Sequence, residues 1–238
     1  MDYFIEIETV SKIIGYLGNA FALFFFLSPI IIMYKLIKGH EDVDKIPGIL
    51  LASQWFNCTL WLIYGIYIEK DEVVICNVIG ASLSLIYITI YILYRFERVA
   101  MKLLIILLTF GLMCGFFAGF YWGVSPIDHE ITGLVAMIFN IILYGSPGQN
   151  LITVFKTGNH NLIPIVSSVV GFLCSSTWTV WGFLNTNKNV IIPNILGVLL
   201  SIIQILVWLY FSRKNKVEQT SDIEAVGDNA RYEPFTKN

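Results

Sequence analysis

Charged residues are scarce in this chain, and their scarcity excludes a soluble globular protein. They make up 13% of the 238 residues, whereas hydrophobic residues make up 56%. A typical soluble domain has about 25% charged residues, and a soluble core of this length cannot bury so much apolar surface. The charges nearly cancel, with a formal net charge of -2. A nucleic-acid binder, which needs basic charge to neutralise phosphates, is therefore excluded as well.

The sequence also lacks the motifs that would support an enzyme or a metalloprotein. Its four cysteines are isolated from one another in apolar runs, so neither a disulfide framework nor a zinc site is expected. There is no Walker A sequence and no HExxH, which leaves ATP-driven chemistry and zinc proteolysis without support. We expect no enzymatic activity, no metal and no cofactor.

Seven long runs without Asp, Glu, Lys or Arg occupy most of the chain. Each is long enough for a transmembrane helix, which needs about 20 mostly apolar residues. Helices are expected because lipid leaves every backbone polar group to be satisfied internally. The polar segment 213–238 is predicted to be a disordered tail, and within it Tyr232–Phe235 has the form of a sorting signal. The seven runs are 13–34, 46–68, 73–94, 103–127, 131–155, 157–187 (with its helix at 163–185) and 189–212.

Lysine and arginine are distributed unevenly between the two sets of connecting loops. Ten lie on the side that includes the start of the C-terminal tail, and three lie on the opposite side. Because positive charge favours the cytosolic side, the amino terminus is predicted to be outside or lumenal and the carboxyl terminus cytosolic. We expect an integral protein of the plasma membrane, with an endomembrane as the alternative.

An internal repeat relates the first three predicted helices to the last three. The fourth has no counterpart, and it restores the side of the membrane so that both halves share one orientation. We therefore predict an all-α membrane protein of 3+1+3 helices, with repeats at 10–95 and 130–212, joined by a linker helix at 101–124. Six pairs lie 117 residues apart: Pro47/Pro164, Trp61/Trp178, Gly65/Gly182, Asn77/Asn194, Gly80/Gly197 and Ser84/Ser201. Five lie 118 apart: Gly15/Gly133, Phe21/Phe139, Ser28/Ser146, Pro29/Pro147 and Lys38/Lys156.

Several of these positions lie in motifs that resemble the SWEET sugar transporters, the MtN3/saliva group related to the PQ-loop proteins. The resemblance covers about residues 10–212 and implies movement of sugars down their gradient by alternating access. None of the seven apolar runs, with the sixth taken as 163–185, contains Asp, Glu, Lys, Arg or His. Proton-coupled transporters usually keep such a residue in the membrane, so uncoupled, bidirectional transport is expected. The matching stretches are 15–29, 61–65, 77–80, 144–147, 178–182 and 193–197.

The repeated asparagines and tryptophans are the predicted sugar-binding residues. Sugar hydroxyls need hydrogen-bonding partners once water is removed, and Asn77 and Asn194 offer both donors and acceptors. The C–H faces of a sugar pack on flat aromatic rings, which Trp61 and Trp178 supply. The resemblance likewise implies sugar contacts at Asn77, Asn194 and Trp178, and a place in the pocket lining for Trp61. The alternatives are that the asparagines hold helices together and that the tryptophans anchor the chain at the membrane interface.

Four further residues lie one helical turn from these motifs and are predicted to line the same cavity. Asn57 and Cys174 precede the tryptophans, and Phe25 and Leu143 precede the two Ser-Pro pairs. Their bulk favours a monosaccharide, glucose or a related hexose, and a disaccharide stays open. The alternative is that these side chains face neighbouring helices.

Matched prolines and one aromatic pair are the candidates for moving parts. The resemblance implies that Pro29, Pro47, Pro147 and Pro164 act as hinges, because proline removes a backbone hydrogen bond and kinks a helix. The alternatives are a static kink or, for Pro47 and Pro164, a helix-start proline.

Tyr64 and its repeat-mate Trp181 are the predicted outer gate. The loop position that is often aspartate in the family is Asn187 here. A charged latch between this position and Lys70 is therefore not expected, and stacking or hydrogen bonding would close the outside instead.

Two other functions remain as alternatives. A PQ-loop transporter of another small solute is one, although both Pro-Gln positions here read Ser-Pro. A seven-helix receptor is the other, but a receptor has no reason to duplicate its first three helices. The expected partners are a small sugar and the lipid bilayer, and assembly into a homo-oligomer is left open.

Overall fold

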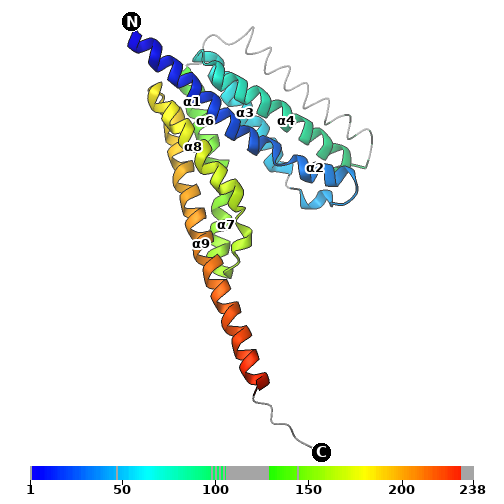
Figure 1. Cartoon of the computed structure of the whole chain (residues 1–238). Coiled ribbons are helices and arrows are strands. Elements are labelled where there is room, and N and C mark those ends of the chain that lie inside the picture. The colour runs from blue at the N-terminus through cyan, green and yellow to red at the C-terminus, as the bar shows by residue number, and fades with distance from the viewer. Residues whose placement is uncertain are drawn as a thin grey trace, which may run out of the picture.

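The computed structural model describes residues 2–46, 48–97, 99, 101, 103, 105, 129–143 and 145–231. All regular elements within this part of the chain are helices, as Figure 1 shows. The predicted linker helix 101–124 lies almost entirely outside the described residues. Pro47 and the Tyr232–Phe235 pattern also lie outside them.

The first repeat contains helices α1 to α4. The first predicted span is divided in two, α1 (Asp2–Leu27) and α2 (Ile30–Ile37), because Pro29 caps the second helix. A 3-10 turn η1 (Val43–Lys45) follows, then α3 (Gly48–Tyr67) and α4 (Asp71–Arg95).

The second repeat has the same order of elements. It consists of α6 (His129–Leu143), α7 (Gly145–Thr157), η2 (His160–Leu162), α8 (Ile165–Leu184) and α9 (Lys188–Arg231). Within the described ranges, five stretches are long and apolar enough to cross a membrane. The fifth predicted span is shared between α6 and α7. The five stretches are Glu6–Ile37, Gly48–Tyr67, Asp71–Arg95, Ile165–Leu184 and Lys188–Asn215.

Local backbone geometry repeats as closely as the sequence does. The turn between α3 and α4 places Glu69 at φ 53°, and the turn between α8 and α9 places Thr186 at φ 52°. Few residues other than glycine adopt this left-handed conformation. In both turns a backbone N–H bonds to the carbonyl of a helix glycine, Lys70 to Gly65 and Asn187 to Gly182. The same tight turn therefore follows α3 in the first repeat and α8 in the second.

Helix α9 continues well beyond the membrane-spanning stretch, and this differs from the sequence prediction. A disordered tail was expected from residue 213, but α9 extends to Arg231 and projects past the other helices (Figure 1). Propagating an existing helix costs far less than nucleating a new one. The segment after Arg213 is rich in good helix formers such as Lys, Glu, Gln and Ala, which explains the extension.

Each repeat contacts the other through its first helix. Helix α1 packs on both α4 and α8, and α6 packs on both α9 and α3. These contacts gather at the end of the bundle that holds the α3–α4 and α8–α9 turns, which we call the closed end. A shared core forms there from Leu60, Trp61, Tyr64 and Val73 of the first repeat and Ala136, Trp181 and Val190 of the second.

At the opposite end, which we call the open end, each repeat has a core of its own. One core consists of Met33, Leu36, Ile46, Leu51 and Tyr87, all from the first repeat. The other consists of Leu151, Val154, Ile163, Val207 and Phe211, all from the second. The two halves are thus joined at one end, and the space between them at the other end is where the candidate site lies.

Candidate functional site

A cavity of about 650 Å³ lies between the two repeats. Its wall extends from the shared core at the closed end to Ser28, Leu50 and Pro164 at the open end, all three of them exposed. All eight predicted substrate-binding residues are in its lining: Phe25, Asn57, Trp61, Asn77, Leu143, Cys174, Trp178 and Asn194. Residues from six helices therefore converge on one pocket, although they are spread over 170 positions of sequence (from 25 to 194, counted inclusively).

The two repeated asparagines are held in the same way. The Nδ2 of Asn77 donates to the Val73 carbonyl at 2.8 Å, and the Nδ2 of Asn194 donates to the Val190 carbonyl at 2.8 Å. Each bond is to the same helix, one turn back, so it orients the amide without joining two helices. The amide oxygen is then the natural acceptor for a ligand hydroxyl.

The two repeated tryptophans differ in how far they are exposed to the cavity. Trp61 is buried with its ring edge-on to Tyr64, the centroids 5.6 Å apart. Trp178 is half-buried and meets Trp181 in a similar way at 5.5 Å. Gly18 permits this placement, since a β-carbon there would lie 2.9 Å from the Trp178 Nε1. Trp178 is therefore the better candidate for a stacking platform.

Asn57 has an unsatisfied acceptor in the cavity wall. Its side chain is 9% exposed, and its Oδ1 has no hydrogen-bond partner among the described residues. Leaving a buried acceptor unpaired is unfavourable, by about 1–3 kcal/mol. Cys174, the matching position, makes only a long contact of 3.9 Å from its Sγ to the Gly18 carbonyl. At this repeated position the first repeat thus offers an unpaired amide oxygen to the cavity, where the second repeat has a thiol.

Several polar lining residues were missed in the sequence. Ser168 donates to the Gln204 Oε1 at 3.2 Å, and both side chains are buried in the wall of the second repeat. Positions 194, 197, 201 and 204 are spaced as on one face of a helix, so the spacing from Asn194 could have identified Ser201 and Gln204. The others missed include Asn140, Asn150 and Ser175.

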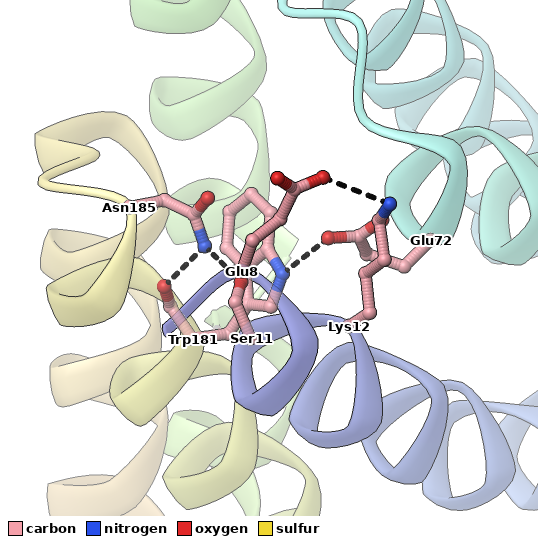
Figure 2. Close-up of polar contacts among 6 residues, drawn as sticks. All are labelled: Glu8, Ser11, Lys12, Glu72, Trp181 and Asn185. Atoms are coloured by element: carbon pink, nitrogen blue, oxygen red, sulfur yellow. Dashed lines mark hydrogen bonds and ion pairs between the residues drawn. The ribbon is translucent and has the colours of Figure 1, made fainter. Parts of the chain in front are cut away.

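The predicted gate residues Tyr64 and Trp181 both lie in the shared core at the closed end, and each bonds across the repeats. The Tyr64 hydroxyl donates to the Asn187 Oδ1 at 3.0 Å and accepts from the Asn189 Nδ2 at 3.4 Å. The Trp181 Nε1 donates to the Glu72 Oε1 at 2.9 Å, as Figure 2 shows. Hydrogen bonds and packed rings therefore join the two halves here.

Glu72 corrects one premise of the sequence analysis. No acidic residue was expected within a membrane helix, but α4 begins at Asp71, and Glu72 is only 1% exposed. The apolar run was counted from residue 73, whereas the helix starts two residues earlier and turns Glu72 inward. The repeat offset could have identified it, since 72 plus 117 is 189 and Asn189 occupies the equivalent place beside Tyr64.

Other contacts at the closed end join α1 to α8. The Asn185 Nδ2 donates to the Ser11 Oγ at 2.6 Å and to the Trp181 carbonyl at 2.9 Å (Figure 2). The ion pair between Lys12 and Glu8, 2.9 Å long, lies within α1 and is exposed. It therefore does not connect the two repeats.

Three of the four predicted hinge prolines are described, and all three stand at helix starts. Pro29 caps α2 and Pro164 caps α8. Pro147 lies in the first turn of α7, and it lines the cavity together with Pro164. A helix-start position agrees with the static alternative for Pro164, and the hinge role stays a prediction.

Comparisons with known proteins agree on one family. The family described as "Sugar efflux transporter for intercellular exchange" matches residues 12–98 and 130–216. The bidirectional sugar transporter SWEET7b of Oryza sativa subsp. indica is 30% identical, over 91% of this chain and 84% of its own. The bidirectional sugar transporter SWEET1 of Arabidopsis thaliana is 29% identical, over 89% and 87%.

The fold comparison leads to the same group. A solved structure of a eukaryotic SWEET transporter superimposes with a TM-score of 0.74 and 27% identity, covering 86% of this chain and 98% of that one. The family match falls on two separate stretches, one in each repeat. The predicted all-α membrane fold of 3+1+3 helices is thereby confirmed.

Proposed function

Because the chain belongs to the SWEET family of sugar transporters, we propose that it carries a monosaccharide across a membrane in both directions by alternating access. The observation that carries this proposal is the cavity between the repeats. It is lined by the duplicated Asn and Trp positions of both halves, and among the described residues the shared core joins the two halves at its closed end. A site bounded by two bodies that can rock against each other is what alternating access requires.

The lining suits a sugar in both its polar and its apolar surface. The amide oxygens of Asn57, Asn77 and Asn194 can accept hydrogen bonds from sugar hydroxyls. The half-buried ring of Trp178 can pack against the C–H face of the sugar. Phe25 and Leu143 bound the cavity with bulky side chains, which favours a hexose over a disaccharide. The predicted substrate-binding role of all eight residues rests on this arrangement.

The structure corresponds to the inward-open state if the closed end faces outward. The positive-inside rule places the amino terminus outside, and α1 begins at the closed end (Figure 1). The hydrogen bonds of Tyr64 and Trp181 then form the shut outer gate, and the exposed rim of Ser28, Leu50 and Pro164 faces the cytosol. The plasma membrane is the proposed location, where such a protein exchanges sugar between the cytosol and the exterior.

Radiolabelled glucose flux in transporter-deficient cells tests the proposal. We expect inward and outward flux for the wild type, each following the gradient. Asn194→Ala and Trp178→Ala should abolish both directions at equal surface expression. Asn161→Ala is the matched control, since Asn161 is exposed and lies in a loop outside the cavity lining. Absence of glucose and related hexose flux in surface-expressed wild type would refute the substrate and favour another small solute.

A further inference from the structure

The outer gate contains a buried carboxylate that the transport mechanism described so far does not use. Glu72 is 1% exposed, and one of its oxygens accepts the bond from Trp181. Its other oxygen, Oε2, has no hydrogen-bond partner among the described residues. An ionisable residue inside a membrane protein is costly and is by default a functional candidate.

The two halves of the gate bring equivalent positions together, but only one half carries a charge. In one half the Trp181 indole donates to Glu72 beside Gly15, and in the other Tyr64 accepts from Asn189 beside Gly133. A β-carbon on Gly15 would lie 2.5 Å from the Glu72 Cγ, and one on Gly133 would overlap the Asn189 Nδ2. Both contacts are therefore close helix packings. A neutral amide suffices for closure in one half, so the carboxylate in the other is not required by the packing.

Closing the gate removes water from this carboxylate and replaces it with a single hydrogen bond. A buried ionised carboxylate loses more free energy by desolvation than a single hydrogen bond restores. Here one bond to an indole N–H is formed and one oxygen is left unpaired. The ionised form of Glu72 therefore opposes closure, whereas a neutral side chain of the same shape does not.

The charged neighbours do not remove this cost. Lys12 and Glu8 on α1 pair with each other and are about half exposed, and the Lys12 ammonium also attracts the Glu72 carboxylate from its exposed position. Asp71 precedes Glu72 on α4 and is exposed, and Lys70 in the turn before it is partly exposed. Exposed charges are screened by water. From α8 the facing groups are Trp181 and Asn185, which are neutral.

Glu72 lies on the outer side of the cavity rather than in it. The lining includes the adjacent Val73 and the ring of Trp178, but neither Glu72 nor Trp181. Trp181 stands almost one turn beyond Trp178 toward the closed end. Glu72 therefore belongs to the gate and not to the cavity wall.

We propose that Glu72 is a positioning residue of the outer gate, and that its ionised carboxylate shifts the gate toward the outward-open state. It orients the Trp181 indole when the gate is shut and favours reopening by regaining water. This inference rests on the proposed transport function.

Accessibility of the native cavity cysteines from outside measures the gate without any sugar. Cys76 and Cys174 are free and line the cavity, so a membrane-impermeant thiol reagent reaches them from outside only through the open gate. Cys58 and Cys114 are replaced by alanine to leave these two. Labelling rates on intact cells are then compared for the parent, Glu72→Gln and Asp71→Asn at one external pH.

We expect Glu72→Gln to slow labelling by roughly fivefold or more, because it removes the desolvated charge and keeps an acceptor for Trp181. Asp71→Asn should behave as the parent, since its acid is exposed. Trp181→Phe, which removes the indole donor, should speed labelling in the parent more than in the Glu72→Gln background.

Faster or unchanged labelling of Glu72→Gln would overturn the proposal, because the carboxylate would then hold the gate shut or have no influence on it. Because labelling needs no sugar, the expected labelling pattern without hexose flux would refute the substrate and keep the gate. Hexose flux without the expected labelling pattern would refute the role of Glu72 in the gate and keep the proposed transport function.

Discussion

Removal of one hydroxyl from the gate, Tyr64→Phe, gives a direct measure of how firmly the shut state is held. Tyr64 is 3% exposed. Its hydroxyl makes two hydrogen bonds to the second repeat, to Asn187 at 3.0 Å and to Asn189 at 3.4 Å. Phenylalanine preserves the ring, its contact with Trp61 and the shared core. The substitution therefore isolates the hydrogen bonds from the packing.

The magnitude follows from the geometry of the two bonds. The 3.0 Å bond contributes about 1 kcal/mol, and the 3.4 Å bond lies beyond the usual range and adds only about a few tenths. Asn187 is not left unsatisfied, because its Oδ1 also accepts the backbone N–H of Val190 at 3.2 Å. The total of about 1–1.4 kcal/mol shifts the gate equilibrium toward the open state by roughly five- to tenfold.

External labelling of Cys76 and Cys174 is the assay, in the background described above. We expect Tyr64→Phe to accelerate it by roughly five- to tenfold, with Tyr94→Phe, an exposed tyrosine near the end of α4, unchanged. An acceleration below about twofold would mean that packing alone holds the gate. Slower labelling would contradict the assignment of this end as the outer one.

Three further substitutions test the cavity and the fold. Asn77→Ala, like Asn194→Ala, should lower hexose flux by roughly tenfold or more through loss of an oriented acceptor, measured at equal surface expression. Phe25→Ala widens the cavity wall and should raise the ratio of disaccharide to glucose flux; an unchanged ratio would refute its role in size selection. Gly182→Ala places a β-carbon 2.8 Å from the Ile191 Cγ1 and 3.2 Å from its backbone nitrogen. It should cost about 1–3 kcal/mol of stability, detected as a lower Tm in detergent, and an unaltered Tm would contradict this.

The pocket residues were predictable because the chain carries its own internal comparison. A repeat of about 117 residues aligns Asn77 with Asn194 and Trp61 with Trp178. Two parallel copies around a common axis bring equivalent positions to the same interface, and all four residues line one cavity. Helical spacing then extended the prediction to Asn57 and Cys174, which lie in the same lining.

The gate was only partly predictable, because its bonds join segments that are far apart in sequence. Tyr64 was predicted from the resemblance and Trp181 as its repeat-mate, but their partners were not predicted. Glu72 fell just outside the predicted span 73–94, since a hydropathy run shows where the charges stop and not where the helix begins. Its inward direction depends on the packing of α4 against α1 and α8, which a single sequence does not reveal.

The amino-acid sequence by itself determined the membrane environment, the helical class and the duplicated plan, because hydropathy and periodicity are properties of the chain alone. Tertiary structure alone decided which end of the cavity is shut and which polar groups shut it. Those contacts require α1 against α8 and α3 against α6, and such packing is set by side-chain shapes meeting across the two repeats. The buried carboxylate of Glu72 acquires its cost, and hence its proposed role, only when those helices close around it.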